Sequence, residues 1–180
     1  MIRAREIARI FETLAPLESG IPGDQLGFIY GDPDRGIHGV ACMWQANVAS
    51  LREAVGQGLD MVICHEALWL PPQQSPWYDG PAEGAIETNR LRRELLDRHG
   101  VVVYRSHSNW DALVADGVPD QAVAALRIDG LREVARQRFF AVDELPAPLS
   151  VRELRDAAAH GLDFADCRIF GDPAQRIQRF

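Results

Sequence analysis

Two short, uninterrupted apolar runs constrain the fold of this chain more than any other feature. They are Met61–Cys64 and Val101–Tyr104. A strand with one face in water alternates apolar and polar residues, whereas a strand covered on both faces is apolar throughout. Both runs are therefore predicted to be buried strands of a parallel sheet, with helices packed against its two faces.

Helix-like and strand-like segments alternate along the rest of the chain. An apolar stripe at helical spacing predicts a helix over about 2–14. The runs 26–30 and 37–43 flank a turn rich in Gly, Asp and Pro, so they are predicted to be neighbouring strands. Caps, breakers and apolar spacing predict further helices over 48–57, 82–98, 119–127 and 150–159, and further strands over 132–142, 166–170 and 176–180.

This order of elements predicts one α/β domain over residues 1–180, a layered sandwich whose mostly parallel central sheet is flanked by helices. A length of 180 residues suits a single domain. The last strand-like segment, 176–180, has two interpretations. It is either a terminal edge strand or the place where a longer protein continues, in which case 131–180 begins a truncated second part.

Composition excludes several functional classes. The formal net charge is −7, the wrong sign for a protein that binds nucleic acid through its phosphates. The basic run at Arg90, Arg92, Arg93 and Arg98 is interpreted as the solvated face of a helix. No apolar run reaches the ~18 residues of a membrane span. Three widely spaced cysteines suit a reducing compartment, so a cytoplasmic protein is expected.

A histidine follows each of the two buried strands. His65-Glu66 comes directly after the first strand, and the segment His107–Asp111 follows the second. In open α/β sheets, ligands bind at the carboxyl ends of the strands, because the loops of adjacent strands converge there. A right-handed crossover would place both loops at the same edge of the sheet. We therefore expect these side chains to share one pocket.

The residue types in these loops suit a divalent transition metal. Imidazole nitrogens and carboxylate oxygens are usual ligands for zinc, iron and manganese. The four candidates are His65, Glu66, His107 and Asp111. They suffice for one ion with exchangeable positions or for half of a two-ion site. The alternative is that each histidine is only a polar residue that closes a hydrogen bond at a strand end.

Other sites are less well supported by the sequence. It contains no GxSxG, no GxxxxGK[ST] and no GxGxxG motif. A nucleophile elbow, a phosphate-binding P-loop and a dinucleotide-binding site are therefore not expected. The loop after His65-Glu66 carries three aromatic residues, Trp69, Trp77 and Tyr78. They are candidates for lining a substrate pocket. The alternatives are a subunit contact and ordinary loop packing.

Three motifs, in this order, resemble the Nif-three-like family of dinuclear-metal, hexameric proteins, some of which carry a GTP cyclohydrolase-like label. Asp24–Gly31 is similar to the family's DNxGLxxG segment, Ile63–Trp69 to its strand with a His-His or His-Glu pair, and His107–Asp111 to its HTNxD motif. The resemblance covers about residues 1–130. It implies that His65, Glu66 and Asp111 are metal ligands, and that His107 is a ligand or is hydrogen-bonded to one.

The resemblance implies a Nif-three-like fold, one or two divalent metals, a homo-oligomer, and hydrolysis of a small heterocyclic or nucleotide-like substrate by metal-activated water. The catalytic residues stay unassigned. Glu66 stands where a second His is commoner, and no HxxxE follows His160. The metal site is then mononuclear, completed by another chain, or lost. The alternative function is a non-enzymatic metal-binding, scaffold or regulatory subunit of an oligomeric ring.

Overall fold

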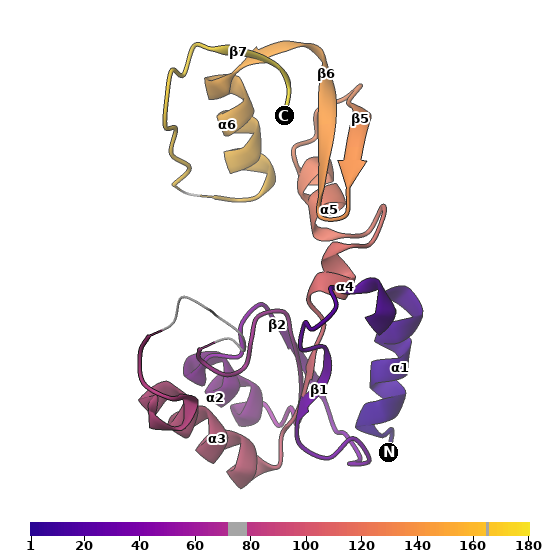
Figure 1. The fold of residues 1–180 in the computed structure, drawn as a ribbon, viewed down its shortest axis with the longest axis vertical. Helices are drawn as coiled ribbons and strands as arrows, with labels where there is room; N and C mark the ends of the chain where they lie inside the picture. The colour runs from indigo at the N-terminus through magenta and orange to yellow at the C-terminus, as the bar shows by residue number, and fades with distance from the viewer. Residues whose placement is uncertain (72–78, 165) are drawn as a thin grey trace. The chain divides into compact units, whose positions relative to one another are not determined.

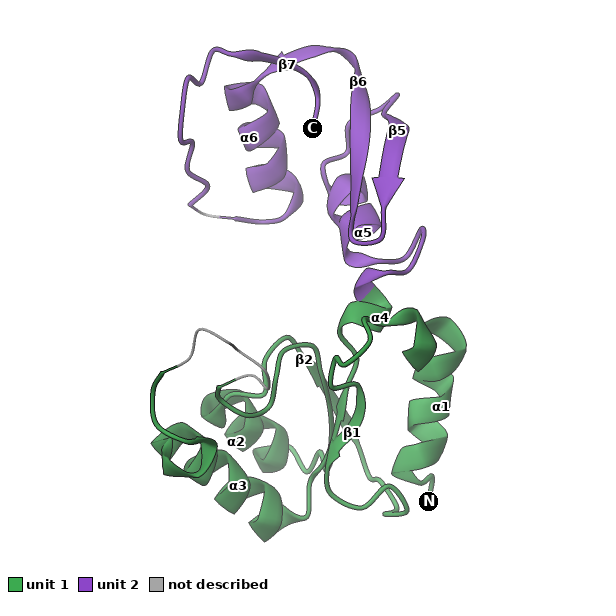
Figure 2. Ribbon diagram, in the orientation of Figure 1, with its two compact units in different colours: residues 1–110 green, residues 111–180 purple. Residues whose placement is uncertain are grey.

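The computed structural model describes residues 1–71, 79–164 and 166–180. These residues form two compact units, 1–110 (unit 1) and 111–180 (unit 2), coloured separately in Figure 2. The strands after residue 131 pair with one another in a sheet of their own. The single domain over residues 1–180 stays a prediction.

Unit 1 is built on a sheet with strand order β1-β4-β3-β2. Strands β2 (Val40–Met43), β3 (Met61–Cys64) and β4 (Val102–Arg105) are parallel, and β1 (Gly27–Tyr30) runs antiparallel to β4. The predicted mainly parallel sheet is therefore confirmed. The expectation that the first two strands are neighbours is wrong, because β3 and β4 lie between them.

Helices cover both faces of this sheet, with α1 (Ala4–Leu14) on one side and α2 (Val48–Gly56) and α3 (Glu87–His99) on the other (Figure 1). Alternate residues of β3 and β4 point to opposite sides. Val62 and Val103 join the cluster with α2 and α3, whereas Ile63 and Val102 join the cluster with α1. Burial on both faces explains the uninterrupted apolar runs, and each such side chain contributes about 1.5–3 kcal/mol.

Local signals set the helix ends in unit 1. The Asn47 side chain caps α2 by accepting hydrogen bonds from the backbone N–H groups of Ala49 and Ser50, at 2.9 and 3.0 Å. Gly100 ends α3 in the left-handed region, with φ of 61°. Both ends agree with the prediction. Two short 3-10 helices, η1 (Leu17–Ser19) and η2 (Glu83–Ala85), lie in the connections.

The basic run on α3 does not form one solvated face. Arg92 is 2% exposed, and its guanidinium donates a hydrogen bond to the carbonyl of Leu68. Arg90 and Arg93 are about half exposed and pair with acidic side chains. The prediction therefore fails for Arg92, because α3 packs on the sheet and turns this position inward.

Unit 2 contains a three-stranded antiparallel sheet of order β5-β6-β7 and two longer helices. Its elements are α5 (Val118–Ala125), β5 (Arg132–Gln137), β6 (Phe140–Ser150), α6 (Val151–Gly161) and β7 (Arg176–Arg179). The predicted strand 132–142 is in fact a hairpin. The predicted strand 166–170 is irregular, and Phe170 there is 93% exposed. The expected capping box of Ser150 and Glu153 is present.

Among the residues that the structure describes, none of the helices has both the length and the apolar character needed to cross a lipid bilayer.

Candidate metal centre

The register of β3 and β4 brings the two histidine loops together. Cys64 is paired with Arg105 at the carboxyl ends of these parallel strands. His65 follows β3 at once, and the Ser106 N–H donates a 3.0 Å hydrogen bond to the Cys64 carbonyl. His107 therefore starts its turn beside His65. The prediction that both loops meet at one edge of the sheet is confirmed.

Three of the predicted ligands form one group. One ligand atom from each of His65, His107 and Asp111 lies within 4.8 Å of the others. The two imidazole rings have centroids 4.7 Å apart at 62°. Asp111 is the last residue of α4 (Ser108–Asp111), one helical turn after His107, which places both on the same side of the turn. This donor set can hold a metal ion.

Glu66, the fourth predicted ligand, is not a member of that group. Its backbone N–H donates a 2.8 Å hydrogen bond to the carbonyl of Trp44, the residue after β2. The bend after Cys64 therefore fastens the His65-Glu66 turn to the neighbouring strand. A role for Glu66 as a ligand stays a prediction.

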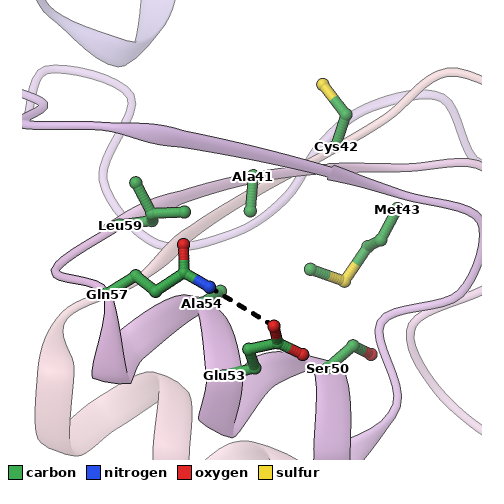
Figure 3. Close-up of a pocket in the computed structure, with 8 residues that line it drawn as sticks. All are labelled: Ala41, Cys42, Met43, Ser50, Glu53, Ala54, Gln57 and Leu59. Carbon is green, nitrogen blue, oxygen red and sulfur yellow. Dashed lines mark hydrogen bonds between the residues drawn. The ribbon is translucent and has the colours of Figure 1, made fainter.

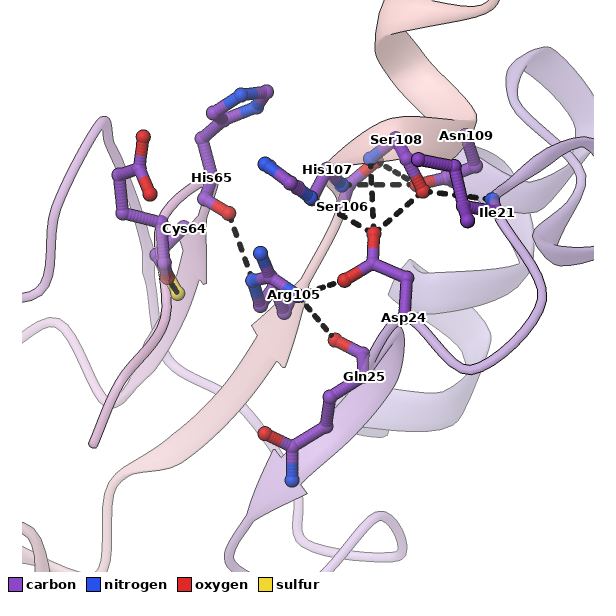
Figure 4. A network of polar contacts seen from close by, with 11 residues as sticks. Ile21, Asp24, Gln25, Cys64, His65, Arg105, Ser106, His107, Ser108 and Asn109 are labelled. Atoms are coloured by element: carbon purple, nitrogen blue, oxygen red, sulfur yellow. Dashed lines mark hydrogen bonds and ion pairs between the residues drawn. The ribbon is translucent and has the colours of Figure 1, made fainter. Parts of the chain in front are cut away.

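Asp24 lies at the centre of a polar network beside the ligands (Figure 4). One carboxylate oxygen pairs with the Arg105 guanidinium at 2.6 Å. The other oxygen lies 2.8 Å from Nδ1 of His107 and accepts a hydrogen bond from the Ser108 hydroxyl. The side chains of Asp24 and Arg105 are 13% and 7% exposed, so this ion pair is largely removed from water.

The network fixes the tautomer of His107. Burial by itself would raise the pKa of Asp24, but hydrogen bonds from Ser108, His107 and Arg105 outweigh burial and hold that pKa well below its usual range. Asp24 is therefore an acceptor, and Nδ1 of His107 must carry the proton that it donates. In the neutral ring, Nε2 then keeps its lone pair. A carboxylate behind a ligating histidine is the usual arrangement in metal sites.

Arg105 and Asn109 hold the two loops in place. Arg105 donates to the carbonyls of His65 and Gln25, at 2.9 and 2.8 Å. The Asn109 side chain is 1% exposed. Its oxygen accepts a 2.9 Å hydrogen bond from the His107 N–H, and its amide group donates to the Ala15 carbonyl at 2.8 Å. Both histidine backbones are thus anchored to surrounding elements.

Asp24 was not among the predicted site residues. Asp24 stands 81 residues before Arg105, so no local spacing connects them. The available signal was its position at the start of the Asp24–Gly31 motif. Trp44 was also not predicted as a site residue. Its indole stacks on the His65 imidazole with ring centroids 4.0 Å apart at 24°.

Of the three predicted substrate-lining aromatics, Trp69 lies among the residues that the structure describes. Trp69 is 8% exposed and packs in the core of unit 1, edge-on to Tyr30 and under the Arg93 guanidinium. The structure thus places Trp69 in a packing position. Trp77 and Tyr78 lie outside the described residues.

A cavity of about 300 Å³ lies between β2 and α2 (Figure 3). It is lined by residues such as Cys42, Glu53 and Gln57, and a Gln57–Glu53 hydrogen bond lies along its wall. None of the four predicted metal ligands lines it. The candidate metal ligands therefore lie at the strand ends and not at this cavity.

The fold and the donor group together define an α/β protein with a candidate metal centre at the carboxyl ends of parallel strands. The sequence matches the family described as Duf34/NIF3 (NGG1p interacting factor 3) over residues 2–180. The chain belongs to this family, as its motifs indicated.

Two curated relatives are both named GTP cyclohydrolase 1 type 2 homolog. The protein from Streptomyces coelicolor is 28% identical over 99% of this chain, and the one from Clostridium acetobutylicum is 21% identical over 99%. The chain spans 63% and 66% of the lengths of these two relatives. These similarities support a NIF3-family role.

Solved structures agree on the fold. A Bacillus cereus protein related to NIF3 has a TM-score of 0.78 at 12% identity, covering 99% of this chain and 75% of that one. Reduced HcgD from Methanocaldococcus jannaschii has a TM-score of 0.68 at 19% identity, covering 88% and 59%. The predicted Nif-three-like α/β architecture is therefore confirmed.

Proposed function

We propose that this protein binds a divalent transition metal through His65, His107 and Asp111 and hydrolyses a small heterocyclic or nucleotide-like substrate. The observation that carries the proposal is the approach of two imidazoles and one carboxylate to within 4.8 Å. Two nitrogens and one oxygen suit zinc, iron or manganese. Glu66 is a further donor in the proposal, for the same ion or for a second one.

A bound metal of this kind supplies a Lewis acid and a water that is nucleophilic near neutral pH. The residues of the chain orient the site. The Asp24 carboxylate accepts a hydrogen bond from Nδ1 of His107, with 2.8 Å between the two heavy atoms, which leaves the Nε2 lone pair available to a metal. Arg105 fixes the His65 carbonyl at 2.9 Å. A Glu66 carboxylate that is not a ligand would act as the base that moves the proton of the attacking water.

The relatives' name supports a ring-opening hydrolysis of a purine nucleotide as the reaction to test first. The −7 net charge means that the metal must offset the phosphate charge of such a substrate. In this proposal the protein works as a homo-oligomer in the cytoplasm.

Elemental analysis of protein purified without chelator tests the metal. We expect stoichiometric transition metal in the wild type and in the controls His160→Ala and Asp116→Ala, whose side chains are exposed. The metal should be lost in His65→Ala and in Asp111→Ala. Folded wild-type protein without metal would overturn the proposal.

Turnover of guanosine triphosphate, followed by chromatography of the nucleotide, tests the reaction. We expect product only from metal-loaded protein, and none from His65→Ala. Stoichiometric metal without turnover of this or related heterocycles would favour the second candidate, a non-enzymatic metal-binding subunit of an oligomeric ring. The observation that keeps this candidate open is that Glu66, the fourth predicted ligand, is not a member of the donor group.

A further inference from the structure

An exposed tryptophan stands directly beside the donor group. Trp44 is 59% exposed, although tryptophan is usually among the most buried side chains. One indole face lies on the His65 imidazole, at 4.0 Å between ring centroids. A ring packed on one face and still 59% exposed presents its other face to solvent. The metal centre therefore has an open aromatic surface at its side.

Hydrogen bonds fix the backbone of Trp44, and packing on the His65 imidazole supports its indole. The Trp44 carbonyl accepts hydrogen bonds from the N–H groups of His65 and Glu66, at 3.1 and 2.8 Å. Trp44 also directly follows β2, whose register with β3 pairs Met43 with Cys64. An aromatic ring that is already ordered loses little conformational entropy when a ligand binds. More of the free energy of the stacking contact therefore appears as binding affinity.

We propose that Trp44 is the substrate-recognition residue of this site and stacks its free indole face on a planar nitrogen heterocycle. The inference rests on the proposed function, because it names the part of the substrate that the site recognises. A ring stacked on that face is separated from the His65 imidazole by the indole itself. Stacking uses the π face that every such heterocycle has, so it sets the class of ligand.

The charge of the chain favours an uncharged ring over a nucleic-acid strand. The formal net charge is −7, and Glu66 follows His65 in the same turn. This charge disfavours a nucleic-acid strand, which proteins bind through its phosphates, whereas a nucleobase or a nucleoside carries no charge that opposes the approach. The ligand class is therefore a small heteroaromatic molecule.

Guanosine, an uncharged purine nucleoside, is the probe, and ribose is its non-planar comparator. Binding to the full chain is measured by equilibrium dialysis and by saturation-transfer NMR, first in EDTA and then after zinc loading. We expect guanosine to bind with its base protons more strongly saturated than its ribose protons, and ribose not to bind. Trp44→Leu should weaken guanosine binding by at least about 5-fold, and Trp44→Phe should retain part of it.

The matched control is Phe140→Leu, which removes another exposed aromatic ring, 53% exposed, and should leave guanosine binding unchanged. Unchanged binding in Trp44→Leu would overturn the inference, as would a wild type that does not bind guanosine. A Trp44→Leu variant that alters the sedimentation of the protein but not guanosine binding would assign the indole to a subunit contact instead.

Measurement in EDTA separates this inference from the metal proposal. Trp44-dependent binding by a protein that holds no metal would leave the recognition site standing and would remove the hydrolase. Stoichiometric metal together with guanosine binding that does not depend on Trp44 would support the metal site and would overturn the recognition role of Trp44. A residue that only positions His65 for the metal would not affect guanosine binding in EDTA.

Discussion

Replacing Asp24 with asparagine tests the network that supports the site. Asp24→Asn keeps the shape of the side chain and removes its charge. It leaves the Arg105 guanidinium, 7% exposed, without its carboxylate. Removing one partner of a buried ion pair typically costs about 3–5 kcal/mol. Arg105 retains the carbonyls of Gln25 and His65, so we expect the lower end, about 3 kcal/mol.

This loss should be measured by urea denaturation of chelator-treated protein, so that metal binding does not contribute. A change of about 3 kcal/mol corresponds to a fall in Tm of roughly 6–12 °C for a chain of this size. The matched control is Asp34→Asn. Asp34 pairs with Arg3 and Arg5 at the surface and is 47% exposed, so its loss should cost less than about 1 kcal/mol.

The pH dependence of stability follows from the lowered pKa of Asp24. A folded-state pKa held below the ordinary value of 3.8 contributes stability that is fully present above that value. The contribution is lost as the pH falls through the folded-state pKa. The difference between wild type and Asp24→Asn should therefore be full at pH 7 and smaller below pH 3.8. An Asp24→Asn variant as stable as Asp34→Asn at pH 7 would show that the buried ion pair of Asp24 and Arg105 does not stabilise the fold.

Three further predictions concern other parts of the chain. Gly100→Ala should destabilise unit 1 by at least about 1 kcal/mol in urea denaturation, because φ is 61° and a Cβ would lie 2.1 Å from the Arg35 side chain. Ser150→Ala should lower the free energy of unfolding by about 1 kcal/mol, because it removes the side-chain cap of α6. The same urea titration, followed through helicity, measures this loss. Cys64 should not react with a thiol reagent at pH 8 until the protein unfolds, because burial raises its pKa to about 11 and leaves it 1% exposed.

The central strands and most helix ends could be predicted because their causes are local. Uninterrupted apolar runs required burial on both faces, and Asn47 and Gly100 marked helix ends by their own chemistry. The order of the strands in the sheet could not be predicted in this way, because it depends on contacts between segments that are distant in the sequence. The short turn after Tyr30 suggested that β1 and β2 pair, but β4 and β3 pair with them instead. The hairpin at Arg138-Phe139 carries no Gly or Asn, so it gave no turn signal.

Some residues of the candidate site could also be predicted from local sequence, and others could not. Two histidine clusters at strand ends were visible in the sequence, because parallel strands align their carboxyl ends. Spacing along the chain did not connect Asp24 or Trp44 with the histidines, because they reach the site through a loop and through a neighbouring strand. Arg92 was misjudged because its neighbours are charged, although its own position faces the core.

X-ray absorption spectroscopy of the zinc-loaded full chain counts the ligand types around the ion and so tests whether His65, His107 and Asp111 bind it. We expect two imidazole ligands, with the remaining donors oxygen, at about 2.0–2.2 Å. In His107→Ala one imidazole should disappear. A sulfur shell near 2.3 Å, or a spectrum without imidazole scattering, would contradict the claim that His65, His107 and Asp111 hold the metal.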